Sequence, residues 1–591
     1  MPQDDSRTWK SEPAIDVSDA IVASMAAGGI DHLFFTSGAE IVFYQEAIAR
    51  AKAQGKPTPR LIVMPHEHAS LNAALGYAAV SGKPAATAAH VDAGTLNYGG
   101  AIHTAWRSGL PVMITAGGGP ASYPGSMHGS RDGGGHIWMQ QPYDQNGILR
   151  QYTKWDHRLE YQDNPGLIVS RALAVALTEP RGPVYLSIPR ELALLDARER
   201  SFPSAAQLGI ARPAAPDLDA IAEIAARLVA ARNPFLVVSE SGQDTATVPA
   251  LVQLCESLAL PVVNSAQKQY LCFPKNHPLW VGRADLSAAD VVLSLQAAIP
   301  WVPGPTAPGP DAWVATIDLD PAKLRTPTFE FTADVRVTSA PLAAIEALLD
   351  AVRGLLAAGD RSRIAERAAR WDDHERARRA ALETEIAARA TRTPIDPLWL
   401  SHQIGRFAGT DTIVLDETLP GNDLDRYLHC AEPGSFFGNP ASSGGWSTGA
   451  AFGAKLAAPE RDVLACTGDG FYMFSTANAV LWAAAHYGAP FTSVIYQNRS
   501  YSTGTTQIAR MYPDGYAAKA GYEGGVFDPP IDFAMEAVAC GAHGKNVRDP
   551  GEILPALQRA RAANRGGVPA VVSVWLPRLD ESAARPKTDK D

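Results

Sequence analysis

The sequence predicts an α/β protein made of three doubly wound, parallel-sheet domains. Short apolar segments alternate with helix-like segments along most of the 591 residues, and this alternation is typical of parallel strands covered by helices. A chain of this length suggests about three or four domains. Two stretches interrupt the alternation, a segment without periodicity at 198–216 and a highly charged one at 360–390. We interpret the first as a linker and the second as a helical connector with a solvated face.

These interruptions divide the chain. We expect an N-terminal domain, a central domain, a helical linker and a C-terminal domain at residues 1–196, 197–355, 356–393 and 394–591. Residues 580–591 are polar and expected to be frayed.

In the N-terminal domain, apolar runs bounded by turn signals predict the strands, and helical spacing predicts the helices. The expected elements are a helix at 17–28, a strand at 32–35, a helix at 40–52, strands at 61–64 and 184–188, and an Ala-rich helix that continues through Val80. In the central domain, strands are expected at 235–239, 262–264, 291–295 and 313–318. The Pro- and Gly-rich run at 301–310 is expected to be a stiff loop.

The C-terminal domain contains the most informative motif. A strand at 463–467 ends in Gly468-Asp469-Gly470, where the two glycines permit a sharp turn. A helix at 475–486 and a second buried strand at 491–496 follow, and Asn498 closes that strand.

Because parallel strands end at the same edge of a sheet, Asp469 and Asn498 are expected to meet. With a backbone carbonyl near Ser500, they form a hard-oxygen site suited to Mg²⁺, which usually completes its shell with phosphate oxygens. The backbone N–H groups that open the helix favour an anion beside the metal. A Gly-Asp-Gly tripeptide alone is first a turn, so the prediction depends on the whole unit.

Composition narrows the class of function. The net charge of −10 does not indicate the excess of basic residues that is typical of nucleic-acid-binding proteins. The first residues, MPQDDSRTWKSEP, lack an apolar signal core, and no apolar run reaches membrane-spanning length. Five scattered cysteines without metal-ligand spacing fit a reducing compartment. We expect a cytoplasmic protein with neither nucleic-acid nor membrane partners.

The 466–501 unit resembles the thiamin diphosphate (ThDP) motif, in which the Asp and Asn hold Mg²⁺ against the cofactor diphosphate. ThDP enzymes also place a Glu at a strand end before an Ala/Gly-rich helix, as Glu67 stands here before AALGYAA at 73–79. The resemblance implies that Glu67 hydrogen-bonds a pyrimidine nitrogen and activates the cofactor. From the residues alone, Glu67 could equally be a helix-start acid favoured by the helix dipole.

A second resemblance is narrower. In the stretch 88–119, a His, an A-G-T, an Asn, a Trp, a Pro and a T-A-G recur at the spacing of benzoylformate decarboxylase, and the segment 433–453 aligns with that family without gaps. Acetolactate synthase is similar more loosely. The resemblance implies a pyrimidine-binding, a central Rossmann-like and a diphosphate-binding domain. It also implies that His90 transfers protons, which an imidazole near neutral pKa can do; a satisfied buried histidine is the alternative.

The resemblance also supplies the candidate ligands of the cofactor. The loop 416–418 follows a strand at 412–415 and is expected to bind the diphosphate, with turn-forming polarity as the alternative. The candidate cofactor-binding residues are Glu417, Thr418, Ser443, Gly444, Gly468, Asp469, Gly470, Asn498 and Ser500, and the candidate metal ligands are Asp469, Asn498 and Ser500.

Five other histidines are weaker candidates. His103 is expected to pack or cap, and His66 and His68 flank Glu67 without a third metal ligand in view. His128 and His136 lie in a Gly-rich loop that could border the pocket.

Two positions depart from the benzoylformate decarboxylase pattern. Ala39 stands where that family has a Ser that contacts the substrate carboxylate, and Gly444 stands where a bulky residue props ThDP into its bent shape. Either Trp446 or another side chain replaces the prop, or the diphosphate and pyrimidine contacts alone hold the cofactor.

We expect ThDP- and Mg²⁺-dependent cleavage of a C–C bond, with decarboxylation of a 2-oxo acid as the main reaction and carboligation as a side reaction. The alternatives are a 2-hydroxyacyl-CoA lyase or an acetolactate synthase-like carboligase acting on an acyl substrate. A non-catalytic relative is disfavoured by the joint presence of Glu67, Asp469 and Asn498. The resemblance further implies a homodimer or homotetramer, with each active site between the first domain of one subunit and the third of another.

Overall fold

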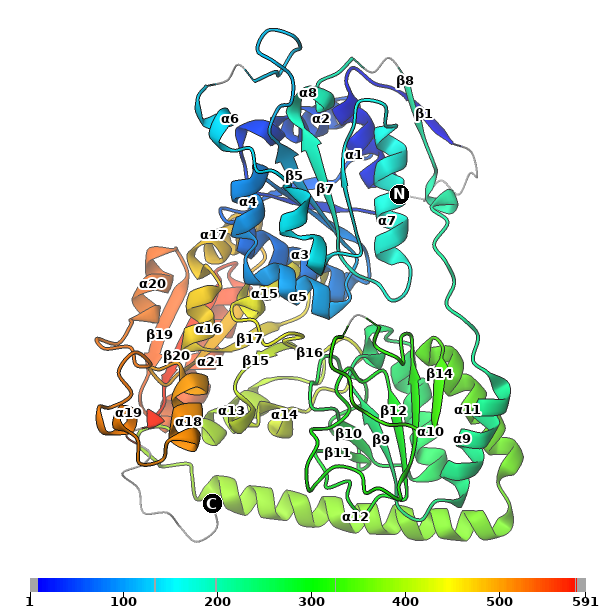
Figure 1. Cartoon of the computed structure of the whole chain (residues 1–591). Coiled ribbons are helices and arrows are strands. Elements are labelled where there is room, and N and C mark those ends of the chain that lie inside the picture. Colours follow the sequence, from blue (N-terminus) through cyan, green and yellow to red (C-terminus); the bar gives the residue numbers. More distant parts are fainter. Residues whose placement is uncertain (1–8, 132–133, 197–198, 325, 580, 582–591) are drawn as a thin grey trace.

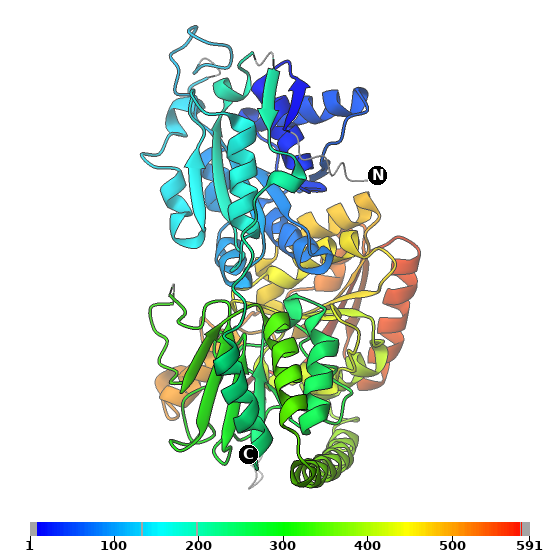
Figure 2. The same cartoon turned by 90° about the vertical axis from the view of Figure 1, so that its right-hand side faces the viewer.

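The described residues form three separate six-stranded sheets of parallel strands and one small two-stranded sheet, which confirms the α/β class (Figure 1). The computed structural model describes residues 9–131, 134–196, 199–324, 326–579 and 581. Figure 2 shows the N-terminal domain above the other two. The expectations for residues 1–8 and 582–591 lie outside the described residues.

The N-terminal sheet has the order β3-β2-β4-β5-β7-β6. Its strands are β2 (His32–Phe35), β3 (Arg60–Val63), β4 (Ala85–Ala89), β5 (Val112–Gly118), β6 (Trp155–Arg158) and β7 (Val184–Pro189). The flanking helices are α1 (Val17–Ala27), α2 (Val42–Ala53), α3 (Glu67–Ser81), α4 (Val91–Asn97), α5 (Gly100–Ser108), α6 (His136–Met139), α7 (Pro165–Leu177) and α8 (Arg190–Ala193), with a 3-10 turn η1 (Ala39–Ile41) before α2. Strands β4, β5 and β7 are buried along their whole length, as strands covered on both faces must be.

The C-terminal sheet, β16-β15-β17-β18-β20-β19, repeats the winding of the N-terminal sheet strand for strand. Its strands are β15 (Ile413–Glu417), β16 (Phe436–Gly438), β17 (Val463–Gly468), β18 (Thr492–Gln497), β19 (His543–Val547) and β20 (Ala570–Trp575). The helices are α13 (Pro397–Phe407), α14 (Leu424–Tyr427), α15 (Trp446–Ala457), α16 (Asp469–Phe474), α17 (Ala477–Tyr487), α18 (Ser502–Met511), α19 (Tyr516–Lys519), α20 (Phe533–Ala539) and α21 (Ile553–Arg565). Strand β15 therefore corresponds to β2, β17 to β4, and helix α15 to α3.

The central sheet has a different order, β11-β10-β9-β12-β13-β14, which is the Rossmann order. Its strands are β9 (Pro234–Val238), β10 (Val262–Asn264), β11 (Trp280–Gly282), β12 (Val291–Leu295), β13 (Trp313–Asp318) and β14 (Val335–Thr338), flanked by α9 (Leu218–Ala230), α10 (Thr247–Leu258) and α11 (Pro341–Leu355). The run 301–310 forms neither helix nor strand. The charged connector is the long helix α12 (Ala358–Ala387), which runs along the lower edge of Figure 1.

Two expectations about local structure were wrong. Part of the expected linker is a strand, β8 (Glu199–Phe202), which pairs antiparallel with β1 (Lys10–Pro13); a pair so distant in sequence has no local signal. The Gly-Asp-Gly motif also does not form the expected turn, because β17 ends at Gly468 and α16 begins at Asp469. A left-handed backbone conformation follows later, at Thr476 (φ 49°).

Helices α3 and α15 form the contact between the N-terminal and C-terminal domains. Small residues let the two backbones touch. A Cβ on Gly453 would lie 1.9 Å from the carbonyl oxygen of Ala73, and one on Gly76 would lie 2.0 Å from that of Ala450. The core of the molecule continues through this contact, so the two domains are fixed relative to each other.

Candidate active site

Glu67 begins α3, directly after β3, at the carboxyl edge of the N-terminal sheet. Its side chain is buried, with 6% of the residue exposed. Asn97 Nδ2 donates a hydrogen bond to Glu67 Oε2 (3.2 Å). A Cβ on Gly94 would lie 2.9 Å from Oε1, so glycine at 94 allows α4 to approach the carboxyl group. Helix α4 thus lies close to the carboxyl group of Glu67 and holds one of its oxygens by a hydrogen bond.

His90 precedes the same helix, at the end of β4. Its Nδ1 lies 2.7 Å from Glu40 Oε2, and Glu40 is 1% exposed. The hydrogen bond to Glu40 raises the pKa of His90 above its ordinary value. Burial alone would raise the pKa of Glu40, but His90 and Arg190 outweigh it and lower that pKa. The pair is therefore an imidazole held by an ionised carboxylate.

Glu40 and Asn97 are functional candidates that the sequence reasoning did not single out. The sequence reasoning placed Glu40 at the start of a helix; in the structure it lies in the 3-10 turn η1, in the loop that follows β2 and two residues after Gly38. That glycine has a packing reason, since its Cβ would lie 2.4 Å from His90 Cβ. A glycine near an acid in the loop after a strand was the available signal.

In the C-terminal domain, Asp469 begins α16 and is 2% exposed. Its Oδ1 accepts a hydrogen bond from Gly470 N (2.8 Å), and its Oδ2 accepts one from Arg499 N (2.5 Å). Asn498 follows β18, and its Oδ1 accepts from Ser500 N (3.0 Å). The structure therefore brings Asp469 to the 498–500 segment, as the parallel strands predicted.

Glu417 is turned inward. Its carboxylate accepts hydrogen bonds from the backbone N–H groups of Trp446 (2.9 Å) and Ser447 (3.0 Å) and from Asn439 Nδ2 (2.8 Å). These bonds satisfy donors at the start of α15. Glu417 stays a candidate cofactor-binding residue, and its side-chain bonds hold in place the loops that carry the other candidates.

Three candidates lie on those loops. Thr418 donates to Asp416 Oδ1 through both its backbone N–H (3.0 Å) and its hydroxyl (2.7 Å). Ser443 Oγ donates to Gly100 O (3.1 Å), across the contact between the domains. Gly444 lies under the rings of Phe471 and Phe474.

The five weaker histidine candidates are buried, make capping or packing contacts, or are exposed to solvent. His66 Nδ1 accepts from His68 N (3.1 Å) at the start of α3, and burial lowers the pKa of His68 to about 4. His103 packs edge-on against Tyr152. His128 and His136 are exposed.

Comparison with known proteins gives matches in both outer domains. Residues 15–148 match the N-terminal TPP binding domain of thiamine pyrophosphate enzymes, and residues 421–574 match their C-terminal TPP binding domain. Thiamine pyrophosphate is ThDP.

The chain is a thiamine pyrophosphate enzyme.

Its relatives include a benzoylformate decarboxylase, acetolactate synthases and sulfoacetaldehyde acetyltransferases. The chain is 28% identical to benzoylformate decarboxylase from Pseudomonas aeruginosa, over 86% of this chain and 90% of that enzyme. It is 26% identical to a probable acetolactate synthase from Mycobacterium bovis, over 96% of each chain. Among solved structures, a ThDP-dependent 4-hydroxybenzoylformate decarboxylase from Rhodococcus jostii RHA1 is similar in fold, with a TM-score of 0.76 and 23% identity, and covers 96% of this chain and 100% of its own. This protein is thus a ThDP-dependent carbon–carbon lyase or carboligase.

The donor set at Asp469 fits the metal of such an enzyme. Among the described residues, no group of three or more His, Cys, Asp or Glu side chains is placed to hold a metal. Asp469 is the one carboxylate here; it is bonded to the backbone of Arg499, and the neighbouring Asn498 offers a neutral amide oxygen. One carboxylate with neutral oxygens leaves several positions for water and phosphate, as Mg²⁺ requires.

A cavity of about 1000 Å³ opens between the central and C-terminal domains, and Asp469, Asn498 and Ser500 are not among its described lining residues. The C-terminal domain contributes Thr418, Asn439, Ser442 and Phe471 to its wall, and the central domain contributes Lys268, whose Nζ lies 2.9 Å from Asp416 Oδ2. Two of the candidate cofactor residues, Glu417 and Thr418, therefore line this cavity.

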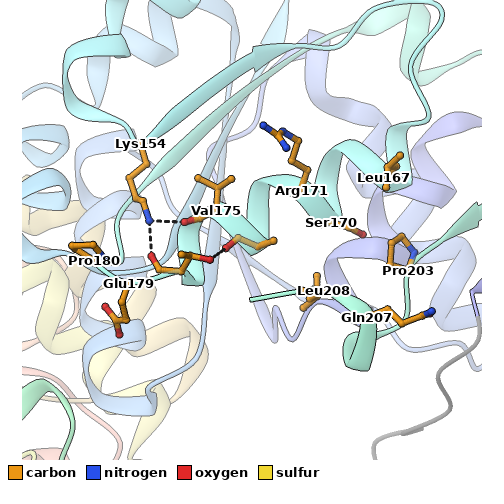
Figure 3. A pocket seen from close by; sticks show the side chains of 13 residues that line it. Lys154, Leu167, Ser170, Arg171, Val175, Glu179, Pro180, Pro203, Gln207 and Leu208 are labelled. Atoms are coloured by element: carbon orange, nitrogen blue, oxygen red, sulfur yellow. Dashed lines mark hydrogen bonds between the residues drawn. The ribbon is translucent and has the colours of Figure 1, made fainter. Parts of the chain in front are cut away.

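A second cavity, of about 600 Å³, lies on the N-terminal domain between α7 and the segment 203–209 (Figure 3). Lys154 Nζ donates there to the carbonyl oxygens of Val175 (2.7 Å) and Thr178 (2.6 Å) and thereby caps the end of α7. None of the candidate site residues lines it. This cavity therefore lies between the capped end of α7 and the segment 203–209 that passes it.

The candidates thus form two half-sites, one with Glu67 and His90 and the other with Asp469 and Asn498. Within the part of the chain that the structure describes, no hydrogen bond or ion pair joins one half-site to the other. No described helix is long and apolar enough to cross a membrane.

Proposed function

We propose that this enzyme decarboxylates a 2-oxo acid with ThDP and Mg²⁺, with carboligation as a side reaction. The observation that carries the proposal is the pair of half-sites at the carboxyl edges of two sheets with the same winding. One offers a buried carboxyl group and a His–Glu pair, and the other offers hard oxygen ligands. Ligand sites of open α/β sheets collect at such edges.

Each half-site has a distinct task. When bound, ThDP supplies a carbanion that adds to the substrate carbonyl and takes up the electron pair released as CO₂ leaves. Asp469, Asn498 and the backbone near Ser500 would hold Mg²⁺, and the loops with Thr418, Ser443, Gly444, Gly468 and Gly470 would surround the cofactor.

On the other half-site, Glu67 would hold the pyrimidine ring through a hydrogen bond to a ring nitrogen, since Asn97 already fixes one of its oxygens. His90 has its Nδ1 on Glu40, so its Nε2 would give a proton to, or take one from, the oxygen or carbon of the reacting substrate. Glu67 is buried and the His90 side chain is only 21% exposed, so the site limits the access of water to the proton transfer.

We further propose a cytoplasmic homodimer or homotetramer that completes each site with half-sites from two subunits. The outer faces near both half-sites expose large apolar side chains, among them Leu96 on α4, Trp138 and Met139 on α6, and Met511 on α18. Exposed apolar groups of this size are typical of protein interfaces.

An acetolactate synthase-like carboligase is the second candidate, and a 2-hydroxyacyl-CoA lyase belongs with it. The similarity to the acetolactate synthase over 96% of both chains favours it. Ala39 favours it too, because this position lacks the hydroxyl group that the benzoylformate decarboxylase pattern uses for the substrate carboxylate.

The first experiment is to follow CO₂ release by the purified protein with ThDP and Mg²⁺ from a panel of 2-oxo acids that includes benzoylformate and pyruvate. We expect release from one subclass of aromatic or bulky acids. If ThDP binds and no acid in the panel loses CO₂, the proposed 2-oxo acid decarboxylation is refuted. Assays with 2-hydroxyacyl-CoA and acyloin substrates then decide between the remaining activities.

A further inference from the structure

Gly444 has no room for a side chain, because aromatic rings already occupy the space. A Cβ built on Gly444 would lie 2.7 Å from Phe471 Cδ1 and 3.0 Å from Phe474 Cδ2. The backbone at Gly444 has no positive φ, so conformation does not demand glycine here. The glycine is needed because the rings come so close.

The two rings differ in what else they touch. Phe471 is partly buried and lines the cavity of about 1000 Å³ together with Asn439 and Ser442. It is the only aromatic residue of the C-terminal domain among the described lining residues. Phe474 is 53% exposed and stacks on Tyr501 instead.

Trp446, the other aromatic residue near Gly444, is not available to the cavity. It is 5% exposed, and its ring belongs to the core beneath α15. Its backbone N–H is bonded to Glu417. The apolar wall of the cavity next to Gly444 is therefore the ring of Phe471.

The position of Phe471 is also fixed relative to the candidate metal ligands. It stands two residues after Asp469, in the first turn of α16, and a Cβ on the intervening Gly470 would lie 2.8 Å from the ring of Tyr501. Phe471 therefore lies within one helical turn of Asp469, on the same helix.

We propose that Phe471 supports the rings of the bound cofactor, in place of the bulky side chain missing at 444. The aromatic face would offer an apolar surface to the heteroaromatic rings and a favourable site for the cationic thiazolium. The bulk that the family pattern places at position 444 would be supplied here by a side chain of the neighbouring helix α16, in the same space. This assignment rests on the proposed ThDP function.

The test measures binding by the full-length protein, by quenching of tryptophan fluorescence in the presence of Mg²⁺. Two probes are used, ThDP and inorganic pyrophosphate, because a ring support contacts only the first. The variants are Phe471→Ala, the neighbouring control Phe474→Ala, Gly444→Leu, and the double variant Gly444→Leu/Phe471→Ala.

We expect Phe471→Ala to raise the Kd for ThDP about tenfold or more and to leave the Kd for pyrophosphate unchanged. Phe474→Ala should change neither value. Gly444→Leu should impair ThDP binding through the clash with Phe471, and the double variant should regain most of the affinity.

Two results overturn the assignment while the wild-type protein still binds ThDP. One is an unchanged ThDP affinity in Phe471→Ala, and the other is an equal loss for both probes, which would mean a distorted metal site. Failure of the wild-type protein to bind ThDP would instead refute the proposed function itself, and this assignment with it.

Discussion

Buried carboxylates have different tasks at different points of this chain. Glu417 uses its oxygens on donors at the start of α15, while Glu67 is fixed by Asn97 and Gly94 beside the opening of α3. Because a buried acid without saturated partners is costly, the carboxyl group of Glu67 is expected to serve a ligand.

Substitution of Glu67 should therefore separate binding from turnover. Glu67→Gln keeps the shape of the side chain but removes its carboxyl group, so we expect ThDP still to bind. Turnover should fall by about 10²–10⁴-fold, which is the usual contribution of a positioned acid or base. The measurement is ThDP affinity and kcat with the preferred 2-oxo acid. Glu46→Gln, an exposed position on α2, is the control. Near-wild-type turnover in Glu67→Gln would remove Glu67 from the mechanism.

Substitution of Asp469 should abolish cofactor binding. Asp469→Ala removes the one carboxylate of the metal candidate, so the Mg²⁺-dependent affinity for ThDP should disappear. Isothermal titration with and without Mg²⁺ measures it, and the exposed Glu460→Gln serves as the control. An unchanged ThDP affinity would refute the metal assignment.

The His90–Glu40 pair predicts a shift in the pH profile. Glu40 raises the pKa of His90, with smaller contributions from Gln140 and Asp92, and Arg190 faces Glu40 from α8. In Glu40→Gln the imidazole loses its proton at lower pH. The limb of kcat/KM that reports loss of the His90 proton should therefore move to lower pH, and Asp92→Asn should move it less. An unmoved limb in Glu40→Gln would mean that His90 does not titrate in catalysis.

At the scale of elements, the contact of α3 with α15 depends on glycine. Even the methyl group of Gly453→Ala would overlap the carbonyl oxygen of Ala73, so the helices must move apart. We expect a loss of stability of about 1–3 kcal/mol, seen as a lower Tm in calorimetry. Gly504→Ala in α18 meets no atom within 4 Å and should be neutral or slightly stabilising. Equal Tm values for the two variants would contradict the close packing.

The sequence allowed prediction of elements whose signal is local. Buried strands such as β12 and helices such as α1 lie where their apolar runs and breakers indicated. The pairing of β1 with β8 was not predictable, because its partners are far apart in the chain. The same limit hid Glu40, whose role exists only through its contact with His90.

At the scale of the whole molecule, the two half-sites predict complementation between subunits. Glu67→Gln and Asp469→Ala chains each lack one half-site, yet a mixed dimer would contain one intact pair. Co-expression with random pairing makes half of the dimers mixed, each with one working site of two, so about a quarter of wild-type activity should return. Activity that stays at the background of the separate variants would place each site within one chain.

The shared winding of the outer sheets has a further consequence for symmetry. Because α3 and α15 are equivalent elements, their contact follows an approximate two-fold axis inside a single chain. A dimer would add an exact two-fold axis, so four similar modules would surround one centre. The side chains at the strand ends would then distinguish the modules. His90 follows β4 in the N-terminal domain, whereas Asp469 follows the equivalent strand β17 in the C-terminal domain. Chemistry would be divided between modules of the same architecture, with proton transfer on one kind and phosphate and metal on the other.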